Sequence, residues 1–90
     1  MKLTYTVVLV KEKDGRYSVS VPALKGCHTW GDTLPEALQM AEEVILLYVE
    51  SLTERGLPVP PDNPEVSVSM REAAEACVYK LTVEERAEVA

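Results

Sequence analysis

Residues 21–38 read VPALKGCHTWGDTLPEAL, and this stretch decides the fold. Its first half predicts a short strand over 27–31 that follows a turn. Its second half predicts a helix start, because Thr33 is a good N-cap and Glu36, three residues later, completes a capping box. Pro35 falls in the first helical turn, where a missing N–H does no harm.

The helix is predicted to run to about Arg55, with Gly56 as the C-cap residue. One apolar stripe at helical spacing supports it. The stripe comprises Leu34, Ala37, Leu38, Ala41, Val44, Ile45, Tyr48 and Leu52. Met40, Leu47 and Val49 widen the apolar face, and they indicate either extra core or a surface for self-association or a partner.

Upstream of this stretch, the pattern predicts a β-hairpin. Residues 3–10 are rich in β-branched residues and are apolar on both faces, which is typical of a central strand. Asp14-Gly15 is a strong hairpin signal, and residues 17–21 alternate between apolar and serine as a second, half-buried strand.

Downstream, residues 57–64 form a proline-rich linker and 65–69 alternate as a fourth strand. A right-handed crossover would place that strand parallel to the first strand, on its free edge. The expected fold is α+β, with element order β-β-β-α-β, sheet order 3-2-1-4 and one long helix packed on the sheet. We expect a domain over 1–70 and a short helical C-terminal extension over 71–90, although 77–79 also fits an extended conformation.

Composition limits the function. The 90-residue chain carries a net charge of -6, which argues against direct DNA or RNA binding and is compatible with a basic protein partner. Two distant cysteines form neither a disulfide framework nor a metal-ligand spacing, and we expect no cofactor. No signal peptide or membrane span is recognisable, so we expect a cytoplasmic protein.

The order and spacing of the turn, cap and small residues between about Tyr5 and Gly56 resemble the HicB-like family of prokaryotic toxin–antitoxin systems. The signature of that family reads roughly V-P-x-L-x-G-C-x-T-x-G-D-T-x-x-E-A. The resemblance implies a partial RNase H-like fold and an antitoxin that blocks a small basic mRNA-cleaving toxin, HicA. Many such antitoxins add a C-terminal DNA-binding domain. The tail here, with 3 basic and 5 acidic residues over 71–90, is too short and too acidic for an ordinary one.

Turns, helix capping and packing account for the residues of the signature, and none of them needs a catalytic role. We expect its glycines to permit turns, Asp32 and Thr33 to cap the helix, Cys27 to pack as a small hydrophobe, and small residues to let the helix approach the sheet. The motif residues are Asp14, Gly15, Tyr17, Val21, Pro22, Gly26, Cys27, Thr29, Gly31, Asp32, Thr33, Glu36, Ala37 and Ala41.

Enzyme chemistry is poorly supported. RNase H chemistry needs converging carboxylates, the first of them on the central strand, where Thr6, Val7 and Val8 stand instead. Cys27 and His28 are strand neighbours, so their side chains point to opposite faces. We therefore expect a protein that is not an enzyme.

Five residues are candidates for a partner or oligomer surface: Trp30, Met40, Glu43, Leu47 and Glu50. Trp30 fits either a core position or an exposed anchor. The glutamates of the helix fit either a solvated face or a mimic of the nucleic acid that a basic toxin binds.

The leading hypothesis is an antitoxin that occludes a HicA-type toxin. The alternative is an orphan HicB-like scaffold without a toxin. In both cases we expect a homo-oligomer, a dimer or tetramer, because one helix cannot cover both faces of the sheet.

Overall fold

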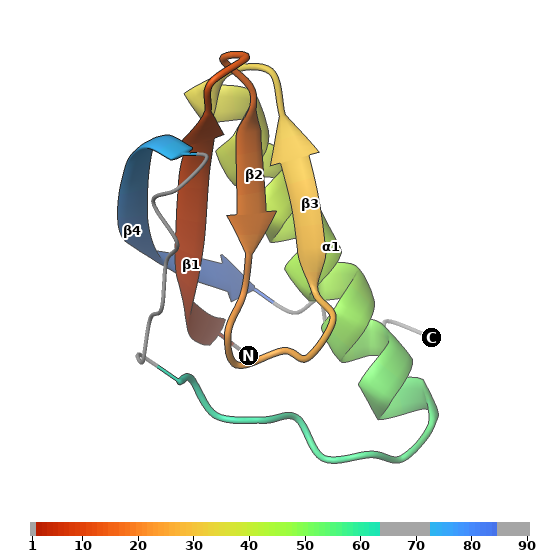
Figure 1. The fold of residues 1–90 in the computed structure, drawn as a ribbon. Coiled ribbons are helices and arrows are strands. Elements are labelled where there is room, and N and C mark those ends of the chain that lie inside the picture. Colours follow the sequence, from red (N-terminus) through yellow and green to blue (C-terminus); the bar gives the residue numbers. More distant parts are fainter. Residues whose placement is uncertain (1, 64–72, 85–90) are drawn as a thin grey trace.

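The computed structural model describes residues 2–63 and 73–84. It contains four strands and one helix, coloured along the chain in Figure 1. In chain order they are β1 (Lys2–Glu12), β2 (Tyr17–Ser20), β3 (His28–Gly31), α1 (Leu34–Glu54) and β4 (Ala73–Glu84). The strands form one antiparallel sheet in the order β3-β2-β1-β4, which confirms the expected α+β class and strand order.

The helix α1 lies against one face of the sheet, behind β2 and β3 in Figure 1, and none of the described residues forms a helix on the opposite face. The core lies between the two layers. Buried strand residues on the helix side are Tyr5, Val7, Leu9, Val19 and Val83. The helix contributes Ala37, Ala41, Ile45 and Val49, each fully buried.

The central position predicted for the first strand is confirmed. β1 pairs with β2 through Val8–Lys11 and with β4 along its whole length. Its odd-numbered residues pack towards α1. On the opposite face Thr6 and Val8 are also buried, with exposed fractions of 1% and 5%. β1 has a partner strand on each edge, and its side chains are buried on both faces. This explains why residues 3–10 are apolar on both faces.

Two expectations about the C-terminal part were wrong. The strand that pairs with β1 is antiparallel to it and spans Ala73–Glu84, where a helical tail was expected. The alanines there favour a helix, but period-two alternation places Cys77, Tyr79, Leu81 and Val83 on the face that packs towards α1, and tertiary burial overrides propensity. The strand expected over 65–69 lies outside the described residues.

The hairpin between β1 and β2 forms as predicted. Gly15 takes a φ of 94°, which only glycine adopts without strain. The N–H of Gly15 donates to the Glu12 carbonyl, and the Glu12 N–H donates to the Arg16 carbonyl. Asp14 accepts a 3.0 Å hydrogen bond from the Arg16 N–H, so its side chain holds the turn.

The start of α1 follows the sequence prediction. Thr33 is the N-cap, and its hydroxyl accepts a 3.2 Å bond from the Glu36 N–H. Thr33 alone accepts a side-chain hydrogen bond from the helix start among the described residues, so the expectation that Asp32 also caps a helix donor is wrong.

The helix ends in a Schellman motif at Gly56, whose φ is 67°. The Gly56 N–H donates to Thr53, and the Leu57 N–H donates to Leu52. The apolar stripe is confirmed with one change. Val49 is fully buried core, whereas Leu47 is 66% exposed, so the residues that widen the stripe divide between core and surface.

The linker after α1 crosses the end of the sheet and is tied to β1 at two points. The Tyr5 hydroxyl donates to the Pro60 carbonyl at 2.7 Å. The Asp62 carboxylate accepts from the Thr6 N–H at 2.7 Å and from the Thr6 hydroxyl at 2.9 Å. β2 ends before it reaches Thr6, so no strand accepts a hydrogen bond from the Thr6 N–H. Asp62 accepts that bond and so satisfies the backbone donor. Lys80 on β4 completes the cluster, with its Nζ 2.7 Å from Asp62.

The packing of Gly31 against α1 gives a first prediction. A Cβ at Gly31 would lie 2.6 Å from the Ala37 nitrogen and 2.8 Å from its Cα. Gly31→Ala must therefore push the helix from the sheet, and we expect it to lower the free energy of unfolding by about 2 kcal/mol or more. Urea unfolding measures this. Gly56→Ala is the comparison, since it has free space and only φ strain, with an expected cost of about 1 kcal/mol. Equal costs for the two variants would contradict the close-approach argument.

The Asp62 cluster gives a second prediction. Burial raises the pKa of the Asp62 carboxyl, but hydrogen bonds from Lys80 and Thr6 and the charge of Lys80 outweigh burial and lower the pKa from 3.8 to about 2. The stabilisation is thus complete above pH 3.8 and is lost as the pH falls through about 2. Asp62→Asn should cost about 1–2 kcal/mol at pH 7 and flatten the pH dependence of stability in this window. Denaturation at stepped pH checks it, and an unchanged acid limb in the variant would contradict it.

Candidate partner-binding surface

The loop between β2 and β3 is held by its own backbone and by α1. The Val21 N–H donates to Cys27, the Leu24 N–H donates to Val21, and the Cys27 N–H donates to Leu24. The side chains of these three residues are buried. The Tyr48 hydroxyl donates to the Lys25 carbonyl at 2.8 Å, which fastens the loop to the helix. Within this stretch the signature residues hold the loop conformation through backbone hydrogen bonds and fill the core with their side chains.

The remaining signature residues also lie in turns or in the packed interior, apart from a few that are partly or fully exposed. Gly26 has a φ of 76°. Burial raises the pKa of the Cys27 thiol, as expected for a packing residue. Tyr17, Pro22 and Thr29 are half-buried, Glu36 is exposed, and Ala37 and Ala41 lie at the helix–sheet contact.

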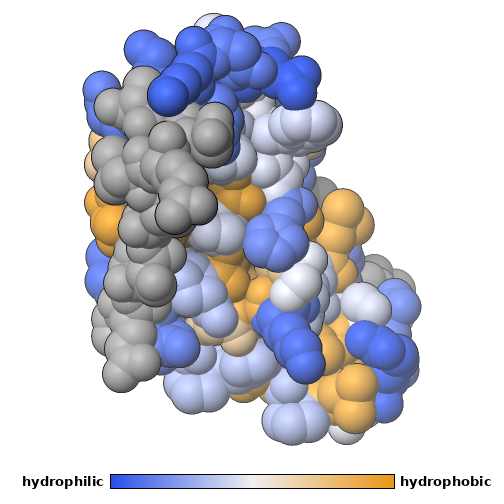
Figure 2. Space-filling view, in the orientation of Figure 1, coloured by the Kyte–Doolittle hydropathy of each residue, from blue (hydrophilic) through white to orange (hydrophobic). Residues whose placement is uncertain are grey.

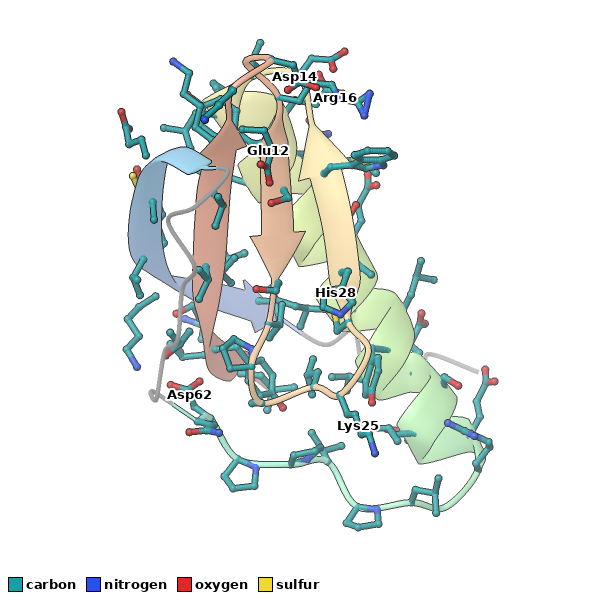
Figure 3. The ribbon with its side chains drawn as sticks, in the orientation of Figure 1. Glu12, Asp14, Arg16, Lys25, His28 and Asp62 are labelled. Atoms are coloured by element: carbon teal, nitrogen blue, oxygen red, sulfur yellow. The ribbon has the colours of Figure 1, made fainter. Side chains whose placement is uncertain are left out.

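Trp30 is 59% exposed, which rules out the core position and leaves the anchor alternative. Its partner across the β2–β3 pair is Ser18, so its ring lies on the helix-free face with that of His28. The Arg16 guanidinium stacks on the indole, 4.2 Å from the ring centroid. Arg16 is itself held by Asp14, with Nε 3.7 Å from the carboxylate. Figure 3 shows Asp14 and Arg16 together at the hairpin end of the sheet, with His28 further along β3.

A hollow of about 360 Å³ connects the Trp30 ring with the start of α1. Its lining residues are Arg16, Trp30, Gly31, Asp32, Glu36 and Met40. The hollow combines an aromatic ring, one face of which is covered by the Arg16 guanidinium, with a thioether and the two carboxylates of Asp32 and Glu36. No salt bridge within the described residues neutralises Asp32 or Glu36. This combination suits the aliphatic stem and charged end of a basic side chain.

The exposed side of α1 continues this surface. Met40, Glu43, Leu47 and Glu50 follow one another at spacings of three and four residues, which places them on one helix face. Leu47 is largely exposed and Met40 is half-buried. Figure 2 shows apolar residues reaching the surface over α1, among hydrophilic ones. We call Trp30, Met40, Glu43, Leu47 and Glu50, with the hollow, the β3–α1 surface.

The charge of the helix is of one sign. Residues 34–54 contain five glutamates and no lysine, arginine or histidine. The glutamates are Glu36, Glu42, Glu43, Glu50 and Glu54. The helix thus carries -5 of the net charge of -6, and the β3–α1 surface is strongly acidic.

The outer edge of β3 has free backbone groups. Because the Val21 N–H bonds to Cys27, hydrogen-bonded pairs alternate along β2 and β3, and the backbone groups of Thr29 and Gly31 face β2. The N–H and C=O groups of His28 and Trp30 therefore point away from the sheet, unpaired in the described part of the chain. An extended segment of a partner can bond there.

The described residues show neither a metal site nor a membrane-spanning helix. Among residues 2–63 and 73–84, no group of three or more histidine, cysteine, aspartate or glutamate side chains is placed to hold a metal ion. In the same ranges, no helix has the length and apolar character required to cross a membrane.

Comparison with known proteins agrees with this architecture. A family model described as "HicB_like antitoxin of bacterial toxin-antitoxin system" matches residues 5–86. The chain belongs to the HicB-like antitoxin family. Similar relatives include a UPF0150 protein of Thermoplasma acidophilum, 48% identical over 63 residues, which are 70% of this chain and 91% of the relative. A UPF0150 protein of Synechocystis is 52% identical over 59 residues, 66% of this chain and 75% of the relative.

Solved structures show the same HicB-like fold. A chain of a toxin–antitoxin complex from Streptococcus pneumoniae is 21% identical and superposes with a TM-score of 0.80, covering 93% of this chain and 70% of that one. The antitoxin HicB of Burkholderia pseudomallei is 25% identical with a TM-score of 0.68, covering 98% of this chain and 74% of that one.

Sequence reasoning missed Arg16 as part of the surface. The signal was present, because the register that pairs Ser18 with Trp30 makes Arg16 a diagonal neighbour of the indole on the same face. The register depends on the length of the loop between the strands, which the sequence pattern left unspecified. Asp62 was missed for a different reason, since only the path of the linker brings it to Thr6.

Trp30 gives a third prediction, because it is the one tryptophan in the sequence. Its fluorescence should be readily quenched by acrylamide, since the indole is largely exposed. Arg16→Ala should raise the quenching rate further by uncovering one ring face. Lys11→Ala is the matched control, because Lys11 lies over Tyr17 and not over Trp30. Slow quenching in the wild type would contradict the exposure of the ring.

Proposed function

We propose that the chain is an antitoxin that binds a small basic HicA-type mRNA-cleaving toxin and occludes its RNA-binding face. The observation that carries the proposal is the β3–α1 surface. One exposed helix flank holds acidic and apolar residues without a single basic one, next to an exposed tryptophan. Family membership supports the class of function, and this surface supplies a chemical reason for a basic partner.

Electrostatics favours a partner that itself binds RNA. Such a protein needs a basic face for phosphate groups. Four of the five glutamates, Glu36, Glu43, Glu50 and Glu54, recur at spacings of seven and four residues along one side of α1. They present a comparable row of negative charge and attract the same face. Long-range attraction of this kind mainly raises the association rate, by about 10-fold or more at low salt.

Apolar contacts then hold the complex. Interfaces depend on a few anchors, and exposed aromatic side chains are prominent among them. Trp30, Met40 and Leu47 provide apolar area along the same surface. The hollow beside Trp30, with Asp32 and Glu36, suits a basic side chain of the toxin. Inhibition would follow from occupancy alone, with one antitoxin surface covering one toxin.

The test titrates the purified chain into a purified HicA-type toxin of the same organism, with RNA cleavage as the readout. We expect cleavage to stop at a stoichiometric ratio. Glu43→Gln with Glu50→Gln should slow association by about 10-fold at low salt, with a smaller effect at high salt. Glu42→Gln with Glu75→Gln is the matched control, since it removes the same charge elsewhere.

Two results would contradict the proposal. In one, an excess of the folded chain leaves cleavage unchanged. In the other, the control pair slows association as much as the Glu43 and Glu50 pair, which would mean that net charge and not this surface determines binding.

A further inference from the structure

The outer edge of β3 is hollowed as well as unpaired. β3 is the last strand at its end of the sheet order, and α1 passes behind it in Figure 1. A hollow of about 270 Å³ is lined by three consecutive residues of this strand, His28, Thr29 and Trp30. Trp30 also lines the hollow of about 360 Å³ at the start of α1. The two hollows therefore follow the strand edge as far as the helix, which leaves space for an extended chain segment.

Backbone groups suited to strand pairing lie along the same edge. The N–H and C=O groups of His28 and Trp30 point outward, and no described residue bonds to them. Residues two apart on a strand have the spacing at which an antiparallel neighbour forms its paired hydrogen bonds. A segment opposite these two residues can thus make four backbone bonds. Addition of a strand to an open sheet edge is a common mode of peptide recognition.

The position opposite Gly31 is the one that reaches the helix. Side chains alternate between the two faces of a sheet, and a Cβ at Gly31 would point at Ala37 of α1. A partner residue opposite Gly31 therefore projects to the helix side, where Gly31 has no side chain to contact it. Asp32, Glu36 and Met40 line the hollow there. Among the described residues neither carboxylate has a salt bridge, which favours a basic side chain at this position.

We propose that an extended segment of the basic toxin adds to β3 as a further strand of the sheet and places a lysine or arginine opposite Gly31, in the hollow. The inference rests on the proposed antitoxin function and specifies how the β3–α1 surface is occupied. The stem of the basic side chain lies along Trp30 and Met40, and its charge reaches Asp32 and Glu36. The backbone bonds hold a segment of almost any sequence, whereas the hollow selects one side chain.

Charge favours a basic segment over a second copy of this chain at this edge. Two copies joined edge to edge at β3 would carry both α1 helices on the same face of one antiparallel sheet. Each helix has five glutamates and no basic residue, so the two helices would repel each other. A basic segment instead neutralises part of this charge.

The experiment follows amide hydrogen exchange by NMR, for the chain alone and for the chain bound to the HicA-type toxin of the same organism. In the free chain the N–H groups of His28 and Trp30 should exchange fast, and they should lose this fast exchange when the toxin binds. The Thr29 N–H is the internal control. It faces β2, so it should exchange slowly in both states.

A proline variant tests the backbone bonds directly. His28→Pro removes one outward N–H, and proline is tolerated at the first residue of an edge strand. His28→Ala is the comparison, since it removes the same imidazole and retains the N–H. We expect His28→Pro to bind the toxin about 10-fold more weakly than His28→Ala. Circular dichroism checks that both variants are folded.

A second pair of substitutions tests the hollow. Asp32→Asn with Glu36→Gln should raise the dissociation rate of the toxin by about 10-fold, because these carboxylates contact the bound side chain. Glu42→Gln with Glu75→Gln is the matched control, since it removes the same charge outside the hollow, and it should leave the dissociation rate unchanged.

The outcomes separate this inference from the proposed function. If the toxin is bound and inhibited while the N–H groups of His28 and Trp30 exchange as fast as in the free chain, the inference is overturned and the proposed function stands. If the toxin does not bind, both fall. Slow exchange in the free chain that is lost on dilution would place a second copy on this edge and would also overturn the inference. Equal toxin affinities of His28→Pro and His28→Ala would do the same.

Discussion

The contact between Gly31 and Ala37 is the constraint on which the other features depend. It brings the last residue of β3 against the first turn of α1, at a separation that leaves no room for a Cβ. Thr33 can then cap the helix immediately after the strand, and the fully buried Ala37 and Ala41 lie flat on the sheet. Because the helix is held there, its acidic flank lies beside Trp30, and the two form one surface.

β1 depends on a second set of contacts, made by distant parts of the chain. β2 covers only part of one edge, and the linker supplies what is missing through Asp62 and Pro60. Lys80 of β4 reaches the same carboxylate, so one ion pair joins the linker, β1 and β4. The Tyr5 hydroxyl lies at this junction, where burial first and the Asp62 charge second raise its pKa.

The contact between β3 and α1 thus creates one surface of distinct chemistry. The β3–α1 surface is acidic, hollowed and anchored by an aromatic ring, which are properties that suit a basic partner protein. The signature residues of the HicB-like family shape the backbone and the core beneath this surface, and Asp32 and Glu36 are the acidic ones among them that line the hollow.

Local chemistry was sufficient to predict much of this fold. Asp14-Gly15, Thr33 with Glu36, and Gly56 each act within a few residues, and the period of the apolar pattern distinguishes α1 from β1 and β2. The same reasoning failed at 73–84, because alanines favour a helix and only burial against β1 and α1 makes the alternating residues a strand. Only the tertiary structure assigned Val49, Leu47 and Trp30 to core or surface. The spacing of residues along a helix or strand tells in which direction a side chain points, but it does not tell what packs against that side chain. The roles of Arg16 and Asp62 likewise depend on strand register and on the path of a linker, which are set by contacts between residues far apart in the chain.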